Sequence, residues 1–375
     1  MQRDLSWLGD QFVIDGDFIS AVPYGSGHIN ETFAASYGTA DGRRRRRYIH
    51  QRINHEVFRD PAALMRNVAR VTRHIRAKLE AEAAGEIDRR VLTLVPTRDG
   101  ADYLVDEDGG YWRTYLFIER AATFDVVEAP EQAREVARAF GEFQKQLTDL
   151  EPPSLVDTIP GFHDTPRRLE AFRSAVRDDV ARRVAGADEE IRRLESFAPL
   201  ADTVLSLVRQ GLVPLRVAHN DTKINNVMID DVTGKAVCVI DLDTVMPGLA
   251  LDDFGDLVRT SVCFAKEDDR DLSKVRVELP LFEGLAQGYI EATRELLTEA
   301  EIDSLVLAGK LMTYECALRF LTDHLQGDTY FRVHHEGHNL DRARVQIALL
   351  DSLVAHESEM RRIVSRAAAR VGQGG

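Results

Sequence analysis

Cysteine and long apolar runs are both scarce in this chain of 375 residues. The three cysteines, Cys238, Cys263 and Cys316, lie far apart and form no CxxC pair, which argues against a disulfide framework or a zinc site. No run of about 18 apolar residues occurs, so the sequence predicts no transmembrane helix. Residues 1–10 also lack an apolar core of signal-peptide length. These absences predict a protein of the reducing cytoplasm with no membrane partner.

Basic residues are also fewer than acidic ones. The chain has 48 Lys and Arg residues against 62 Asp and Glu residues, which gives a net charge of -14. Such a chain repels a polyanion, so we expect no nucleic-acid partner, although a nucleotide carried by magnesium remains compatible. The hydrophobic fraction of 44% is typical of a globular protein, and the length suffices for two domains. No sustained heptad pattern occurs, so we expect a monomer.

The first third of the chain alternates short apolar segments with turn residues, which is typical of strands. Residues 61–79 instead place apolar side chains at three- and four-residue spacing, as one face of a helix does. Residues 43–47 are five consecutive arginines, which indicate the solvated edge of a hairpin, with a polyanion-binding patch as the alternative. The expected strands are residues 12–19, 30–37, 48–53, 91–96, 102–106 and 112–119.

The rest of the chain has mostly helical periodicity, with one short β section over residues 215–240. The expected helical blocks are residues 129–147, 165–209 and 273–370. The sequence therefore predicts an α+β protein in two lobes. A small β-rich lobe covers residues 1–118, a linker follows near residue 120, and a larger helical lobe with an embedded hairpin covers residues 119–375.

A polar loop follows the first strand of that β section. Residues 219–226 read His-Asn-Asp-Thr-Lys-Ile-Asn-Asn, and a turn then returns the chain to Asp241. Phosphoryl transfer needs a carboxylate to orient the attacking hydroxyl and oxygen ligands to hold Mg²⁺, and this spacing matches the catalytic loop of kinases. We therefore expect Asp221 to be the catalytic base and Lys223 to neutralise the transferred phosphoryl group. Asn226 and Asp241 are the expected Mg²⁺ ligands.

Two neighbouring residues leave alternatives open. Asp243 either supports Asp241 or touches the metal itself. His219 lies two residues before Asp221, so we expect it to brace the loop by bonding to the backbone rather than to act as a base.

Together with residues 252–256, Asp-Asp-Phe-Gly-Asp, this segment resembles the aminoglycoside phosphotransferase and choline kinase superfamily. The resemblance implies a protein-kinase-like two-lobed fold that uses ATP. It also implies that Asp241, and not Asp253 of the Asp-Phe-Gly triplet, binds the metal. Asp253 is then expected to buttress the catalytic loop.

The resemblance is closer still to the N-acetylhexosamine 1-kinases, and it extends over nearly the whole chain. It implies transfer of the ATP γ-phosphate to the anomeric hydroxyl of an N-acetylhexosamine such as GlcNAc or GalNAc. The segments that carry the resemblance are residues 25–30 (Gly-Ser-Gly-His-Ile-Asn), 111–119 (Tyr-Trp-Arg-Thr-Tyr-Leu-Phe-Ile-Glu), 162–166, 219–226, 240–248, 319–323, 327–331 and 338–340.

The expected nucleotide site combines the glycine-rich stretch with the linker. Ser26, Gly27 and His28 would bring backbone N–H groups close to phosphate oxygens, with an ordinary hairpin turn as the alternative. Phe117 and Ile118 either contact adenine or pack in the core.

The strand over residues 48–53 lacks the lysine that kinases direct to the nucleotide phosphates. Arg52 is the expected substitute, or Gln51 if the strand presents its other face. The helix over residues 61–79 offers no acidic residue to pair with Arg52.

The resemblance places the acceptor against Arg319 and Tyr330, with His28 reaching over it and Asp221 orienting its hydroxyl. From the residues alone, an ion pair between Arg319 and Asp323, four residues later on a helix, is the alternative role for Arg319. Packing against a neighbouring helix is the alternative for Tyr330.

Three other functions stay open. A kinase of the same fold that acts on an aminoglycoside, an amino alcohol or another sugar would carry the same catalytic segment. A non-catalytic nucleotide-binding protein would explain the missing lysine, although intact Asp221, Asn226 and Asp241 argue against it. A metal-dependent hydrolase would use the aspartates but would not explain the glycine-rich stretch.

Overall fold

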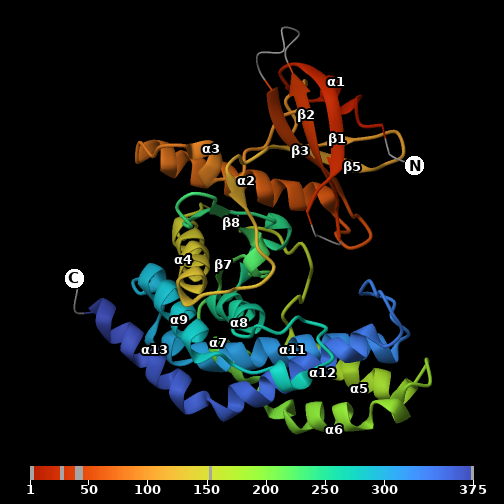
Figure 1. Ribbon diagram of the computed structural model, residues 1–375, viewed down its shortest axis with the longest axis vertical. Helices are drawn as coiled ribbons and strands as arrows, with labels where there is room; N and C mark the ends of the chain where they lie inside the picture. The colour runs from red at the N-terminus through yellow and green to blue at the C-terminus, as the bar shows by residue number, and fades with distance from the viewer. Residues whose placement is uncertain (1–3, 26–28, 39–44, 152–153, 373–375) are drawn as a thin grey trace.

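A computed structural model of the chain describes residues 4–25, 29–38, 45–151 and 154–372. A β-sheet region built from the first third of the chain lies at one end, and a larger helical region lies below it (Figure 1). The predicted fold class is therefore confirmed as a mixed α/β structure with a β-rich N-terminal part and a helical C-terminal part. Within the described ranges, no helix is long and apolar enough to cross a membrane.

The N-terminal sheet is antiparallel and has the order β1-β2-β3-β5-β4. Its register places Gln51 opposite Arg113 and Arg52 opposite Trp112. Because side chains alternate between the two faces of a strand, Gln51 and Arg52 point to opposite faces. The strands are β1 (Asp17–Pro23), β2 (Glu31–Gly38), β3 (Arg45–Ile53), β4 (Leu104–Val105) and β5 (Tyr111–Leu116).

Two strand predictions need correction. Residues 12–19 do not form one strand, because the short helix α1 (Leu8–Gln11) ends just before them and β1 begins only at Asp17. Residues 91–96 follow the short helix α3 (Ile87–Arg90) and form only an isolated bridge, between Leu94 and Tyr115. That segment and β4 share one edge of β5, so neither has room for a full-length strand.

The arginine run also differs from its prediction. Arg45 begins β3, which is an inner strand of the sheet rather than an edge strand. The pairing of β3 with β5 begins only at Tyr48, so the arginines before it lie at the open end of the strand. Arg46 is exposed there and forms an ion pair with Asp15 at 3.3 Å. Arg45 and Arg46 are exposed to solvent, as expected, while Arg43 and Arg44 lie outside the described residues.

The long helix α2 (Pro61–Ala81) joins the two regions. Asp60 caps it by accepting a hydrogen bond from the Ala63 N–H at 2.8 Å, and proline occupies the first helical position, where no N–H is needed. The predicted apolar face is buried, and it packs in one core cluster with Met228, Cys238 and Val245 of the helical region. Burial of each large apolar side chain contributes about 1.5–3 kcal/mol, so this contact fixes the sheet region to the catalytic segment.

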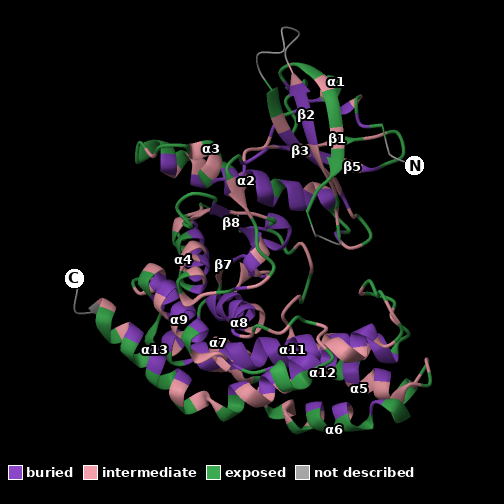
Figure 2. Ribbon diagram, in the orientation of Figure 1, coloured by how far each residue is buried: buried purple, intermediate pink, exposed green. Residues whose placement is uncertain are grey.

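The helical region surrounds a small set of strands. Strands β6 (Ala121–Ala122), β8 (Val227–Asp230) and β9 (Ala236–Val239) form one sheet, and β7 (Arg216–Ala218) pairs with β10 (Met246–Gly248). Helices α8 and α11 are buried at the centre, while α6 and α13 lie outside with exposed faces (Figure 2). The helices are α4 (Pro130–Gln146), α5 (Thr165–Asp178), α6 (Asp188–Ser196), α7 (Thr203–Arg209), α8 (Ala250–Ser261), α9 (Leu279–Thr293), α10 (Glu299–Asp303), α11 (Leu305–Leu325), α12 (His338–Ala355) and α13 (Glu357–Gly372).

Helices α4 and α9 approach each other at backbone distance. A Cβ atom placed on Gly288 of α9 would lie 2.1 Å from the carbonyl oxygen of Arg134 on α4, closer than any van der Waals contact permits. The absence of a side chain at this position therefore sets the separation of the two helices.

We predict that Gly288→Ala lowers the free energy of unfolding by about 2–4 kcal/mol, because overpacking against a rigid backbone outweighs the helix propensity gained by alanine. Urea denaturation measures the change. Gly186→Ala is the matched control, since a Cβ atom there meets no neighbour within 4 Å. Equal stability of the two variants would contradict the close contact.

Candidate active site

The expected catalytic loop, residues 219–226, begins where β7 ends. Asn220 follows in the left-handed backbone region with φ of +65°, and its side-chain amide donates to the Thr244 carbonyl at 2.9 Å and the Ala218 carbonyl at 3.2 Å. The one-turn helix over residues 224–226 and strand β8 come next. A conformation that costs energy for most residues is thus stabilised by hydrogen bonds within the loop.

Asp253 of α8 anchors this loop from beneath. Its carboxylate accepts the backbone N–H groups of His219 at 3.0 Å and Asn220 at 2.7 Å, and the side-chain amide of Gln144 at 2.5 Å. Thr222 donates its hydroxyl to the Asp253 carbonyl oxygen at 2.6 Å. Asp253 is fully buried and both of its carboxylate oxygens accept hydrogen bonds from the protein, which agrees with the buttress role that the resemblance implied.

His219 braces the loop from inside the core. Its Nε2 donates to the Ile240 carbonyl at 3.0 Å, and its Nδ1 accepts the backbone N–H of Asp221 at 3.3 Å. The ring is fully buried against Phe140 and Phe143. Both ring nitrogens are therefore used by backbone groups, so His219 is a structural residue and not a base.

Asp221, Lys223 and Asn226 meet at the surface of the loop. Lys223 Nζ lies 3.0 Å from Asp221 Oδ2, and Asn226 donates its side-chain amide to the Asp221 carbonyl at 2.8 Å and to Oδ2 at 3.2 Å. Burial alone would raise the pKa of Asp221, but the nearby Lys223 ammonium outweighs it and lowers that pKa. The Asp221 carboxylate in turn raises the pKa of Lys223. Asp221 is therefore ionised and Lys223 charged at neutral pH.

Asp241 lies next to this group. The Ile240 N–H donates to the Asn226 carbonyl at 2.9 Å, which brings Asn226 and Asp241 to adjacent strand ends. Desolvation within the site and the carboxylates of Asp243 and Asp221 raise the pKa of Asp241 to about 6. The residue as a whole is exposed, so the repulsion between carboxylates is the cause that the geometry supports best. A bound cation would relieve that repulsion.

The donor set suits a cation that needs few protein ligands. Among the described residues no group of three or more His, Cys, Asp or Glu side chains is arranged to hold a metal. Asn226 uses its amide nitrogen within the loop, which leaves its amide oxygen for a cation beside Asp241. Mg²⁺ often takes only one or two carboxylates from the protein and completes its shell with phosphates and water, so these residues fit it.

The two oxygens of Asp243 are both bonded to the sheet region. Oδ1 pairs with Nη1 of Arg113 on β5 at 2.5 Å, and Oδ2 accepts the side-chain amide of Asn30 at 2.6 Å. Of the two roles left open for Asp243, this arrangement favours support of the segment that contains Asp241.

The structure describes only some of the residues predicted to bind the nucleotide. Ser26, Gly27 and His28 lie outside the described residues. Phe117 stacks under the Arg47 guanidinium, 3.7 Å from the ring centroid, and meets the Tyr24 ring edge-to-face at 5.4 Å. Tyr24 is the residue just before the glycine-rich stretch in the sequence. 

Ile118 packs in the core cluster that includes α2. Arg52 points to the face of β3 opposite Gln51, where a Cβ atom on Gly110 would touch both its Nε and the carboxylate of Asp106. The structure does not bring Arg52 to the catalytic segment. Gln51 accepts the Arg113 Nε–H at 3.0 Å instead and so faces that segment.

A small hollow of about 40 Å³ opens beside Asp221. Arg319, the expected acceptor residue, lines it together with other side chains from α8 and α11. Asp256 accepts from Arg259 at 2.8 Å through Oδ1, while its buried Oδ2 has no partner among the described residues. The polar lining consists of His163, Asn220, Asp221, Asp256, Arg259, Glu315 and Arg319.

The alternative ion pair between Arg319 and Asp323 is wrong. Asp323 instead accepts the backbone N–H groups of Thr329, Tyr330 and Phe331, at 2.8–2.9 Å, and so caps the turn after α11. Arg319 lies among aromatic rings, 5.2 Å from the centroid of Phe162. Tyr330 is 6.0 Å from the Arg319 guanidinium and 57% exposed, so it is not packed in the core, and it stays outside the hollow.

His163 and Glu315 form a buried ion pair in the wall of the hollow. His163 donates from Nδ1 to Glu315 at 2.9 Å and from Nε2 to the Asn220 carbonyl at 3.1 Å. Thr165 donates to the second Glu315 oxygen at 2.6 Å. Burial disfavours the charged imidazole, but Glu315 outweighs burial and raises the pKa of His163 to about 9. His163 is therefore cationic at neutral pH.

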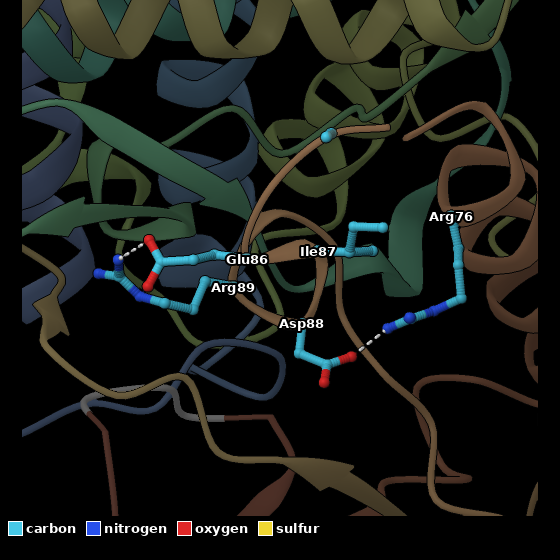
Figure 3. A pocket seen from close by; sticks show the side chains of 6 residues that line it. Arg76, Glu86, Ile87, Asp88 and Arg89 are labelled. Carbon is cyan, nitrogen blue, oxygen red and sulfur yellow. Dashed lines mark hydrogen bonds and ion pairs between the residues drawn. The ribbon is translucent and has the colours of Figure 1, made fainter. Parts of the chain in front are cut away.

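A second hollow, of about 390 Å³, lies at α3 on the surface of the sheet region (Figure 3). Its charges pair with one another, Arg76 with Asp88 at 2.6 Å and Arg89 with Glu86 at 3.1 Å. Arg89 also donates to the carbonyls of residues 119 and 120. These side chains hold the linker, and the hollow lies away from Asp221.

Sequence reasoning missed five polar residues of the site. Arg113, His163, Asp256, Arg259 and Glu315 are distant from the catalytic loop in the sequence, and helix or strand periodicity gives them no role. The signal available was the position of charged residues within otherwise buried elements, since a buried charge needs a partner.

A β-sheet region joined to a helical region, with a buttressed aspartate loop between strands, defines a protein of the kinase-like phosphotransferase class. The sequence model of the phosphotransferase enzyme family, APH, matches residues 20–293. The chain belongs to this family.

Solved structures share the fold. An aminoglycoside phosphotransferase from Alicyclobacillus acidocaldarius is 14% identical, with a TM-score of 0.53 over 99% of this chain and 95% of that one. A choline kinase from Cryptosporidium parvum is 14% identical, with a TM-score of 0.54 over 95% and 92%. A spectinomycin phosphotransferase solved with ADP and spectinomycin is 12% identical, with a TM-score of 0.52 over 94% and 96%. At such identities the likeness establishes the fold alone.

We predict that the His163–Glu315 pair makes stability fall in mild alkali. The folded pKa of His163, about 9, exceeds its ordinary value of 6.5, so the contribution is complete below pH 6.5 and is lost as pH rises through 9. The loss is at most about 3 kcal/mol. Urea denaturation between pH 6 and 10 should show this fall in the wild type and not in His163→Gln, whose side chain does not titrate. Parallel pH profiles would contradict it.

Proposed function

We propose that the chain transfers the γ-phosphoryl group of ATP to the anomeric hydroxyl of an N-acetylhexosamine. The observation that carries this proposal is the ionised Asp221 beside Lys223 at the mouth of a hollow with balanced charges. The family assignment supports phosphoryl transfer to a small molecule, and the resemblance of the motifs supports the sugar.

Each polar residue of the loop has a separate proposed role. Asp221 orients the acceptor hydroxyl and takes its proton, since an ionised carboxylate held by Asn226 is a fixed acceptor. Lys223 places a positive charge beside the transferred group. When bound, Mg²⁺ neutralises and aligns the phosphates, and Asn226 and Asp241 would hold it.

The sheet region supplies the proposed nucleotide side. We propose residues 1–118 as the nucleotide-binding lobe and residues 119–375 as the lobe that carries the catalytic loop and the acceptor. Phe117 contacts Tyr24, the residue before the glycine-rich stretch, which supports a place for the adenine near the linker. The solved spectinomycin phosphotransferase holds ADP in the same fold, which supports ATP as the donor.

The charge of the hollow argues for a neutral acceptor. Three anionic side chains line it, Asp221, Asp256 and Glu315. Three cationic ones balance them, His163, Arg259 and Arg319. A choline or aminoglycoside acceptor would bring positive charge against the guanidinium groups of Arg259 and Arg319, which is unfavourable. A neutral sugar can instead use such groups as hydrogen-bond donors and the free Asp256 oxygen as an acceptor.

We predict that Asp221→Asn lowers kcat by about 10²–10⁴-fold, because the amide cannot accept the hydroxyl proton. Binding of ADP, followed by isothermal titration, should change by less than threefold. Asp231→Asn, an exposed residue in the turn after β8, is the control and should keep wild-type turnover. Turnover of Asp221→Asn near that of the control would overturn the assignment of the base.

We predict that an acceptor screen with ATP and Mg²⁺ finds ADP release with N-acetylhexosamines and little with choline or kanamycin. Phosphorus NMR of the product should show coupling to the anomeric proton, which separates a 1-phosphate from a 6-phosphate. Arg319→Met should raise the acceptor KM by at least tenfold, because a donor in the hollow is lost. ADP release only with cationic acceptors would contradict the sugar, and release with none would favour a non-catalytic nucleotide-binding protein.

A further inference from the structure

Arg113 is a fully buried arginine in the middle of strand β5, and the proposed chemistry assigns it no role. Its side chain is 1% exposed, and the strand lies between β3 and β4 in the sheet. An arginine stays charged in proteins, so its burial requires a compensating partner. The identity of that partner indicates the role of Arg113.

The partner of Arg113 belongs to the catalytic segment rather than to the sheet. Nη1 pairs with Oδ1 of Asp243 at 2.5 Å, across 130 residues of sequence. Nε donates to Oε1 of Gln51 at 3.0 Å, and Gln51 in turn donates to Thr32 at 2.9 Å. The guanidinium is therefore fixed on one side by neighbouring strands and reaches into the helical region on the other.

Asp243 is held at its second oxygen as well. Asn30, just before β2, donates to Oδ2 at 2.6 Å, and its own amide oxygen accepts the Asn54 N–H at 3.0 Å. Strands β2, β3 and β5 thus all contribute to the position of one carboxylate. That carboxylate is 2% exposed and belongs to the turn over residues 242–244.

The turn begins at Asp241, the proposed metal ligand. Asp241 adopts the left-handed backbone region with φ of +59°, a conformation that an L-residue keeps only when its surroundings hold it. Ile240 before it is held by the Asn226 carbonyl and His219, and Asp243, two residues after Asp241, fixes the other side of the turn to the sheet. A shift of Asp243 would therefore rotate the Asp241 carboxylate directly.

We propose that Arg113 is a positioning residue that acts through Asp243 to set the metal-binding orientation of Asp241. The sheet thereby aligns the metal ligand with the nucleotide. The inference rests on the proposed function, because it takes Asp241 as a ligand of the nucleotide-bound metal. Arg113 also supplies, from β5, a positive charge on the face of the sheet that Arg52 does not reach, since Arg52 points to the opposite face of β3.

The test measures metal binding directly and needs no acceptor. Mn²⁺ replaces Mg²⁺ as the probe, and its affinity for the full-length protein with ADP is read by electron paramagnetic resonance. Arg113→Met should weaken Mn²⁺ binding in the ADP complex by at least tenfold, while binding of ADP in EDTA changes by less than threefold. Arg113→Lys, which keeps a charge opposite Asp243, should recover part of the affinity.

A matched control separates positioning from general stability. Lys310→Met breaks another largely buried ion pair, with Glu357 at 2.6 Å, between helices α11 and α13. It should lower the melting temperature and leave Mn²⁺ affinity unchanged. Unchanged Mn²⁺ affinity in folded Arg113→Met would overturn the proposal.

The double variant Arg113→Met/Asp243→Asn guards against a single variant that fails to fold, because it leaves no unpaired buried charge. Its loss of Mn²⁺ affinity should equal that of Asp243→Asn alone, as expected for two residues that act through one contact. Additive losses, or wild-type affinity in the double variant, would overturn the proposal. A wild type that binds no Mn²⁺ with ADP would overturn the proposed function as well, whereas failure of the acceptor screen alone would leave the inference intact.

Discussion

The conformation of the loop over residues 219–226 depends on one buried carboxylate, that of Asp253. Two consecutive backbone N–H groups, of His219 and Asn220, donate to it, and Gln144 donates from the opposite side. Burial raises the pKa of Asp253, and these donors offset the rise by favouring the ionised form. Because an unsatisfied buried donor costs about 1–3 kcal/mol, loss of this single group would free the left-handed turn that presents Asp221. The position of Asp221 at the loop surface thus depends on the buried Asp253 carboxylate beneath the loop.

The two regions of the molecule are joined by apolar and polar contacts together. The apolar face of α2 packs against β8, β9 and the turn after them, so the catalytic hairpin and the sheet share one core cluster. Arg89 crosses the same boundary by binding Asp230 at 2.6 Å as well as the linker carbonyls. Apolar packing gives the interface its stability, while the charged contacts fix its register, since a hydrogen bond tolerates far less displacement than an apolar contact.

Sequence patterns predicted what is local and missed what tertiary packing decides. Asp221, Lys223 and Asn226 lie within six residues of one another, so the spacing alone brought them together. The fold class followed from periodicity in the same way. Residues 91–96 have the composition of a strand but share an edge of β5 with β4, which no pattern within the segment reveals. Likewise, Asp323 stands four residues after Arg319 as an ion pair would require, yet the turn after α11 takes both of its oxygens.

Helix α8 carries three buried aspartates whose roles differ because their hydrogen-bond and charge partners differ. Asp252, Asp253 and Asp256 are all buried within two turns. Asp253 receives only neutral donors and holds a loop, whereas Asp256 pairs with Arg259 and keeps one oxygen toward the hollow. For Asp252, burial raises the pKa to about 7, and the cationic His163 offsets only part of the rise.

Gly255, between Asp253 and Asp256, allows α8 to lie close to α11. A Cβ atom on Gly255 would lie 2.5 Å from the Ala308 carbonyl oxygen of α11, so α8 approaches the helix that carries Glu315 and Arg319 at backbone distance. One face of α8 can then support the loop over residues 219–226 while the next face lines the hollow beside Asp221. The placement of Asp221 relative to Glu315 and Arg319 therefore depends on the close packing of these two helices.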